Sequence, residues 1–73
     1  MAKYQFTVVT EQDEDGVYIS SCPALQGCYS QGDTYEEAVE NLKDAIKLSI
    51  EARQSLGEPI PIEVAVDWVE VNI

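Results

Sequence analysis

The chain has 73 residues, of which 4 are lysine or arginine and 14 are aspartate or glutamate, and its formal net charge at pH 7 is −10. This length gives one small domain, and the 45% of apolar residues predicts a folded core rather than a disordered acidic tail. The charge disfavours direct binding to nucleic acid, because it repels phosphates, and favours encounter with a basic partner. The sequence contains no histidine, which excludes Cys/His zinc sites and nucleophiles activated by an imidazole base.

The first half of the chain has the pattern of an antiparallel β-meander. Residues 3–10 alternate between apolar and polar side chains, which is typical of a half-buried strand. The pair Asp15-Gly16 predicts a tight turn, and residues 17–22 form the returning strand. Pro23 ends that strand, and a third strand is expected over residues 28–31.

One helix and a last strand are expected after the meander. Thr34 stands three residues before Glu37, which is the spacing of an N-terminal capping box, and apolar residues then recur every three or four positions. Gly57 marks the end of the helix, and residues 62–71 predict a fourth strand that joins the sheet. The expected fold is therefore α+β in the order β-β-β-α-β, with one helix packed on one face of the sheet.

The glycine-containing stretch at residues 27–38, GCYSQGDTYEEA, allows two interpretations. Gly27 and Gly32 have the spacing of the two glycines in a phosphate-binding Walker loop. However, Asp33 occupies the position of the lysine that such a loop needs, and its carboxylate would repel a phosphate. We therefore interpret the stretch as the end of a strand followed by the turn into a capped helix.

The two cysteines, Cys22 and Cys28, are too few for a four-thiolate metal site, and their spacing differs from the redox motif C-x-x-C. We expect two reduced and mostly buried thiols in a cytoplasmic protein without cofactors, although the sequence leaves open whether they are bridged. No segment has the composition of a signal peptide or the length of a membrane span, so no membrane association is expected.

An ordered set of residues in the turns and the helix carries a resemblance to a known family. The set comprises Asp15-Gly16, Pro23, Leu25, Gly27-Cys28, Gly32-Asp33-Thr34, Glu37-Ala38, Asn41 and Ala45. At these spacings it resembles the HicB-type antitoxins over residues 3–56. The resemblance implies a partial ribonuclease-H-like fold and a role in holding a small basic mRNA-cleaving toxin, HicA, inactive by direct binding.

Many HicB antitoxins also carry a C-terminal module that binds DNA. This chain stops two residues after the predicted fourth strand and has no basic segment that could replace such a module. We therefore expect a single HicB-like domain over residues 1–73, with no DNA-binding module and no direct contact with nucleic acid.

A metal-dependent nuclease is the least favoured function. Enzymes with a ribonuclease-H-like fold use carboxylates to gather two metal ions, but the first strand has no acidic residue and Asp67 has no evident partner. The run Asp13–Gly16 resembles part of a calcium loop, yet the twelfth position is Ala24 rather than a bidentate glutamate. We expect no catalytic residue and no metal site.

Two surfaces are candidates for contacts with other proteins. The acidic hairpin, made of Glu11, Asp13, Glu14 and Asp15, is expected to meet the basic toxin. The last strand is apolar on both faces because of Trp68, Val69 and Val71. This pattern predicts a strand that is central in the sheet or covered by another subunit, and a β-bulge that resets the register is the alternative. We favour a homo-oligomer, a dimer or higher. The alternative function is an oligomeric interaction domain that stands alone, without a toxin partner.

Overall fold

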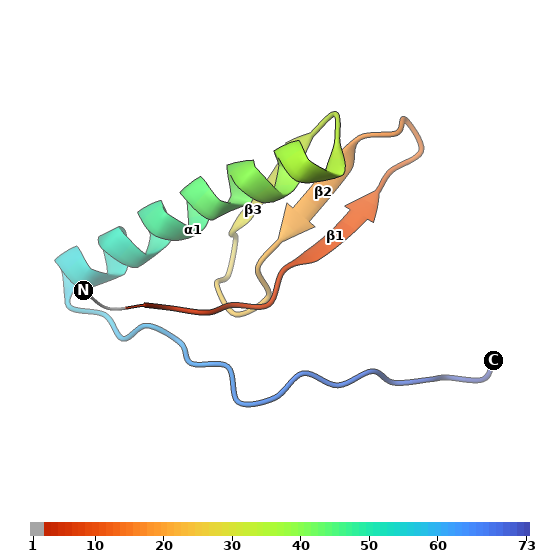
Figure 1. The fold of residues 1–73 in the computed structure, drawn as a ribbon. Helices are drawn as coiled ribbons and strands as arrows, with labels where there is room; N and C mark the ends of the chain where they lie inside the picture. The colour runs from red at the N-terminus through yellow and green to blue at the C-terminus, as the bar shows by residue number, and fades with distance from the viewer. Residues whose placement is uncertain (1–2) are drawn as a thin grey trace.

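A three-stranded antiparallel sheet and one long helix make up the fold (Figure 1). The structure is a computed structural model, and it describes residues 3–73. The strands are β1 (Val9–Gln12), β2 (Tyr18–Ser21) and β3 (Tyr29–Gly32), in the spatial order β1-β2-β3, and the helix is α1 (Tyr35–Leu56). The α+β class and the antiparallel meander followed by a helix are confirmed.

The first turn of the meander forms for local reasons. At the first turn, Asp13 Oδ1 accepts hydrogen bonds from the backbone N–H groups of Asp15 and Val17, each at 2.9 Å. Gly16 has a φ of 85°, a backbone conformation that glycine adopts without steric cost. The resulting register places Thr10 opposite Ser20, and their hydroxyl oxygens are 2.8 Å apart.

Helix α1 has defined caps at both ends. Thr34 Oγ1 accepts a hydrogen bond from the backbone N–H of Glu37 at 3.1 Å, which is one of the two bonds of the predicted capping box. At the other end Gly57 has a φ of 71°, and the N–H groups of Gly57 and Glu58 donate to the carbonyls of Gln54 and Arg53. This is the arrangement of a Schellman motif, and it ends the helix where the sequence predicted.

We predict that Thr34→Ala lowers the free energy of unfolding by about 0.5–2 kcal/mol and leaves partner affinity unchanged. The hydroxyl satisfies a backbone N–H that otherwise has no partner within the helix. Urea denaturation followed by circular dichroism measures the change, and Thr34→Ser serves as a control that keeps the capping oxygen. A large loss of partner binding at an unchanged melting temperature would instead identify a recognition site.

The core lies between α1 and one face of the sheet. Its buried residues are Cys22, Leu25, Cys28, Ala38 and Leu42. Two hydrogen bonds also join β3 to the helix, from Ser30 Oγ to the carbonyl of Ala38 at 2.7 Å and from Asn41 Nδ2 to the carbonyl of Gln31 at 3.0 Å. The opposite face of the sheet has no helix on it within the described chain (Figure 1).

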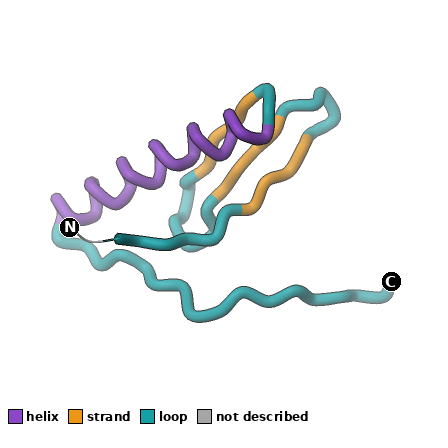
Figure 2. Tube along the Cα trace, in the orientation of Figure 1, coloured by secondary structure: helices purple, strands orange, loops and turns teal. Residues whose placement is uncertain are grey.

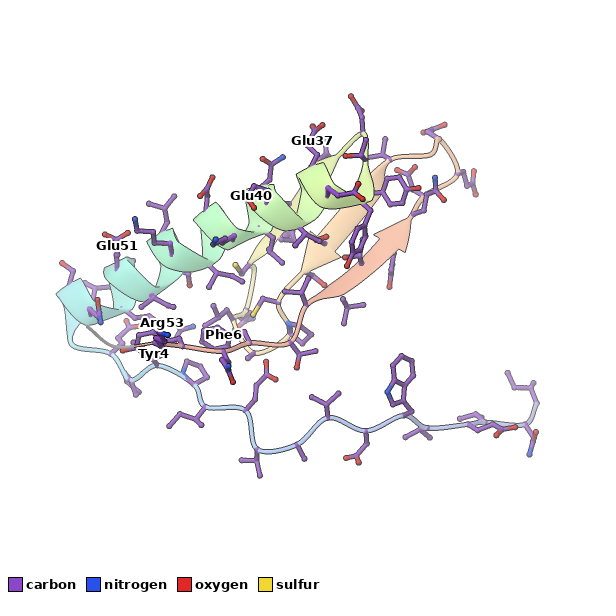
Figure 3. All side chains as sticks on the ribbon, in the orientation of Figure 1. Tyr4, Phe6, Glu37, Glu40, Glu51 and Arg53 are labelled. Atoms are coloured by element: carbon purple, nitrogen blue, oxygen red, sulfur yellow. The ribbon has the colours of Figure 1, made fainter. Side chains whose placement is uncertain are left out.

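The first strand was predicted over residues 3–10, but β1 spans Val9–Gln12, because residues 3–8 pair with no neighbouring strand. Their alternation is nevertheless kept in part. Tyr4, Phe6 and Val8 line a groove together with Val39 and Ile46 of α1, and Gln5 lines it as well, so the separation of the two faces is only partial. The rings of Tyr4 and Phe6 stack with centroids 6.5 Å apart (Figure 3).

The fourth strand predicted over residues 62–71 does not form in this structure. Residues 58–73 form an extended segment that is not part of the sheet (Figure 2). A strand requires a partner for its backbone groups, and the edge of β1 does not pair with this segment. The side chain of Glu63 links this segment to the N-terminal part of the chain. Glu63 Oε1 accepts a hydrogen bond from the Thr7 N–H at 2.6 Å, and Oε2 accepts one from the Thr7 hydroxyl.

Candidate partner-binding surfaces

The acidic hairpin predicted to meet a basic partner is assembled by the turn between β1 and β2. Glu11 lies on β1 and the three other carboxylates lie in the turn, and all four side chains are exposed. The four carboxylates are not equally available to a partner, because Asp13 Oδ1 already accepts hydrogen bonds from two backbone N–H groups of the turn. Asp13 therefore has a structural role, and Glu11, Glu14 and Asp15 are the better candidates for contacts with a cation.

A second acidic surface, which was not predicted as a site, lies along the outward face of α1. Glu37, Glu40 and Glu51 are exposed and point away from the sheet (Figure 3). Exposed Glu36 and Asp44 on the same helix add to this surface, and two exposed lysines, Lys43 and Lys47, lie among the carboxylates. The signal was present in the sequence as acidic residues recurring at three- and four-residue spacing, which places side chains on one face of a helix.

The C-terminal segment, residues 58–73, carries the residues predicted to form an oligomer interface. Trp68 is 98% exposed, Val69 81% and Val71 71%, so none of the three is covered by its own chain. Ile62 and Val64 on the same segment are also almost fully exposed. A run of large apolar side chains left in water is typical of a surface that binds another molecule.

The two thiols lie side by side at the end of the β2–β3 pair. The backbone N–H of Cys22 donates to the carbonyl of Cys28 at 3.0 Å, and both side chains are buried and free. Burial raises the pKa of both thiols, which keeps them protonated and poorly nucleophilic. The prediction that both cysteines are buried is confirmed.

Glu63 is the anchor of the C-terminal segment. The hydrogen bonds from the Thr7 hydroxyl and from the Thr7 backbone N–H lower the pKa of its carboxyl, because both stabilise the ionised form. The carboxylate therefore accepts from Thr7 at neutral pH, and the segment starts beside residues 5–7.

Among residues 3–73, no group of three histidine, cysteine, aspartate or glutamate side chains is placed to hold a metal ion. Over the same residues, no helix combines the length and the apolar composition that crossing a membrane requires.

The chain folds as a small α+β domain that exposes an acidic hairpin and an apolar C-terminal segment. The family described as "HicB_like antitoxin of bacterial toxin-antitoxin system" matches residues 6–72. The chain therefore belongs to the HicB-like antitoxin family, and the resemblance seen in the sequence is confirmed.

Relatives from several organisms are similar to the chain. A UPF0150 protein of Synechocystis sp. is 48% identical over 60 residues, covering 82% of this chain and 76% of that protein. Antitoxin HicB 1 of Photorhabdus laumondii is 36% identical over 71 residues, covering 94% of this chain and 46% of the antitoxin.

A solved structure has the same fold. The N-terminal domain of Burkholderia pseudomallei antitoxin HicB matches with a TM-score of 0.73 and 28% identity, covering 84% of this chain and 72% of that domain. Membership of an antitoxin family favours a role without catalysis.

Proposed function

We propose that the protein is a cytoplasmic antitoxin that neutralises a small basic mRNA-cleaving toxin of the HicA type by direct binding. The observation that carries this proposal is the match of the HicB-like antitoxin family to residues 6–72. The net charge of −10 supports it, because an acidic domain attracts a basic protein and repels nucleic acid.

The acidic hairpin is the proposed contact for the toxin. Glu11, Glu14 and Asp15 are exposed at the end of the sheet that carries the β1–β2 turn (Figure 1), the same end at which β3 leads into α1. Charges at such a rim act mainly on the rate of association, and their effect is screened by salt.

Self-association is the second candidate function, and it is compatible with the first. The exposure of Trp68, Val69 and Val71 favours it, because water-exposed aromatic and aliphatic side chains gain free energy when a partner covers them. In this proposal the protein is a homo-oligomer, a dimer or higher. A chain that self-associates but binds no toxin would be an interaction domain that stands alone.

We predict that reversing two hairpin charges, in the variant Glu14→Lys/Asp15→Lys, slows association with the toxin about tenfold at low salt. The test uses the basic product of the neighbouring reading frame and measures association rates by surface plasmon resonance. The difference from the unmodified protein should vanish at about 1 M salt, where charges are screened beyond about 3 Å.

A matched control changes the net charge equally on the other acidic surface. Glu40→Lys/Glu51→Lys on α1 raises the net charge by the same four units and should leave the association rate closer to that of the unmodified protein. An equal loss in both variants would contradict a hairpin site and indicate general attraction. Failure of the unmodified protein to bind the neighbouring product at low salt would overturn the antitoxin proposal.

A further inference from the structure

Cys22 and Cys28 face each other where β2 and β3 are joined. Ser21 lies opposite Tyr29 in the β2–β3 register, and one step further along the backbone N–H of Cys22 donates to the carbonyl of Cys28 at 3.0 Å. Directly opposite residues of an antiparallel pair have Cα atoms about 4.5–5.5 Å apart, and their side chains lie on the same face of the sheet. The two thiols are therefore close neighbours that leave the backbone in the same direction.

This placement meets the backbone requirement of a disulfide. Bridged cysteines have Cα atoms about 4.4–6.8 Å apart, a range that includes the separation of directly opposite residues. Both side chains pack in one cluster with Leu25 and Leu42, so both lie on the side of the sheet that α1 covers. The chain between them is held in shape, because the Leu25 N–H donates to the Cys22 carbonyl at 3.0 Å and the Cys28 N–H donates to the Leu25 carbonyl at 3.1 Å. A bond between the two sulfur atoms can therefore form by rotation of the side chains, with the backbone left in place.

The two cysteines differ in how well solvent reaches them. Cys22 is 2% exposed and Cys28 is 9% exposed. Cys28 also lines a surface hollow between the β2–β3 connection and α1, together with Gly27, Tyr29 and Leu48. A small oxidant that enters this hollow meets Cys28 first, and Cys22 lies behind it in the core.

We propose that Cys22 and Cys28 are a redox-sensitive pair, which hydrogen peroxide converts to an intramolecular disulfide. The Cys28 sulfur attacks one peroxide oxygen, the O–O bond breaks, and the departing hydroxide takes the thiol proton to form water, which leaves a sulfenic acid on Cys28. The Cys22 sulfur then attacks the Cys28 sulfur, and the S–S bond forms as the C–S–OH group loses hydroxide, which leaves as water with the Cys22 proton. The two thiols give up two electrons, and one peroxide becomes two waters.

The reaction is expected to be slow at neutral pH. Burial raises the pKa of both thiols, and at Cys28 the neighbouring Cys22 adds to the rise. The thiolate is the reactive form, so little of either cysteine reacts at neutral pH, and the rate of oxidation should increase as the pH rises. Such a pair responds to a sustained excess of peroxide, as expected in a reducing compartment, where disulfides are mostly transient and serve catalysis or redox sensing.

The disulfide closes the connection between β2 and β3 into a covalent ring. A crosslink stabilises a fold mainly by restricting the unfolded chain, so the oxidised protein should melt at a temperature about 5 °C or more above that of the reduced protein. The acidic hairpin lies at the other end of β2 (Figure 1), so oxidation should leave the association of a basic partner with that hairpin unchanged. The inference goes beyond the proposed function and does not depend on it.

Mass spectrometry of the full-length protein after treatment with hydrogen peroxide tests the pairing. The expected product is a single chain about 2 Da lighter than the untreated one, with no thiol left to react with a maleimide after unfolding. Dithiothreitol should restore the original mass, the maleimide reaction and the lower melting temperature. Two variants test the order of the steps. Cys22→Ser should accumulate a sulfenic acid on Cys28 that dimedone traps, and Cys28→Ser should react several times more slowly, because its remaining thiol is the deeper one.

Three results would overturn the proposal. The first is two free thiols that persist in the folded protein under peroxide, while the same chain forms the disulfide once urea has unfolded it. The second is a disulfide that joins two chains and leaves no intramolecular product. The third is a lower melting temperature of the oxidised single chain, which would mean that the native backbone resists the bond. None of these measurements uses a toxin, so their outcome is separate from the test of toxin binding.

Discussion

Replacing Leu42 with alanine is expected to lower the free energy of unfolding by about 2–5 kcal/mol. The side chain is 0% exposed and packs in the cluster formed with Cys22, Leu25 and Cys28. A chain of this size has a total stability of about 4–11 kcal/mol, so the loss amounts to a large fraction of it. Urea denaturation followed by circular dichroism measures the change.

The same substitution at a neighbouring helical position provides the control. Leu48 is also on α1 but is 68% exposed, so Leu48→Ala should change the free energy of unfolding by less than about 0.5 kcal/mol. Equal losses in the two variants would mean that α1 does not pack on the sheet through Leu42, and the fold as described would be wrong.

The elements that depend on local signals were predictable from the sequence. The first turn follows from Asp13 and from Asp15-Gly16, whose side-chain and backbone preferences act within five residues. The helix ends follow from Thr34 and Gly57, for which the cap residue and its bonding partners are at most four positions apart. In each case the sequence motif itself contains the groups that make the hydrogen bonds.

Whether residues 62–71 form a fourth strand could not be predicted from local signals. An apolar, β-branched segment such as residues 62–71 shows that the chain favours an extended conformation, but a strand also needs a neighbour with free backbone groups. Whether that neighbour is β1 or another molecule depends on contacts distant in sequence or outside the chain. The extended conformation was therefore predictable, and the pairing was not.

For the candidate surfaces, too, the sequence predicted one part and the structure was needed for the other. That the hairpin would collect four carboxylates followed from its sequence, because a tight turn keeps neighbouring residues together. That Asp13 would be engaged by the backbone of the turn required the geometry, since Asp15 and Val17 both donate to one of its oxygens. A pattern of charge locates a surface, and the hydrogen bonds decide which of its residues are free to act.

Gly32→Ala is expected to destabilise the protein by about 1–3 kcal/mol, because the site has no room for a side chain. A Cβ atom at this position would lie 2.7 Å from the backbone N of Ala38 and 3.0 Å from the carbonyl carbon of Glu37, both in the first turns of α1. Backbone atoms cannot move aside as a flexible side chain can, so the helix and β3 would have to separate. Thermal and urea denaturation measure the loss.

Gly27→Asn is the control for this substitution. Gly27 has a φ of 75° and open space around it, and asparagine tolerates that conformation, so a much smaller loss is expected there. Full stability of Gly32→Ala would contradict the close approach of β3 to the helix. The predicted loss would instead show that packing accounts for the glycine of the Gly32-Asp33-Thr34 turn. A residue without a Cβ lets β3 touch the start of the helix, so this glycine does not require a phosphate-binding role.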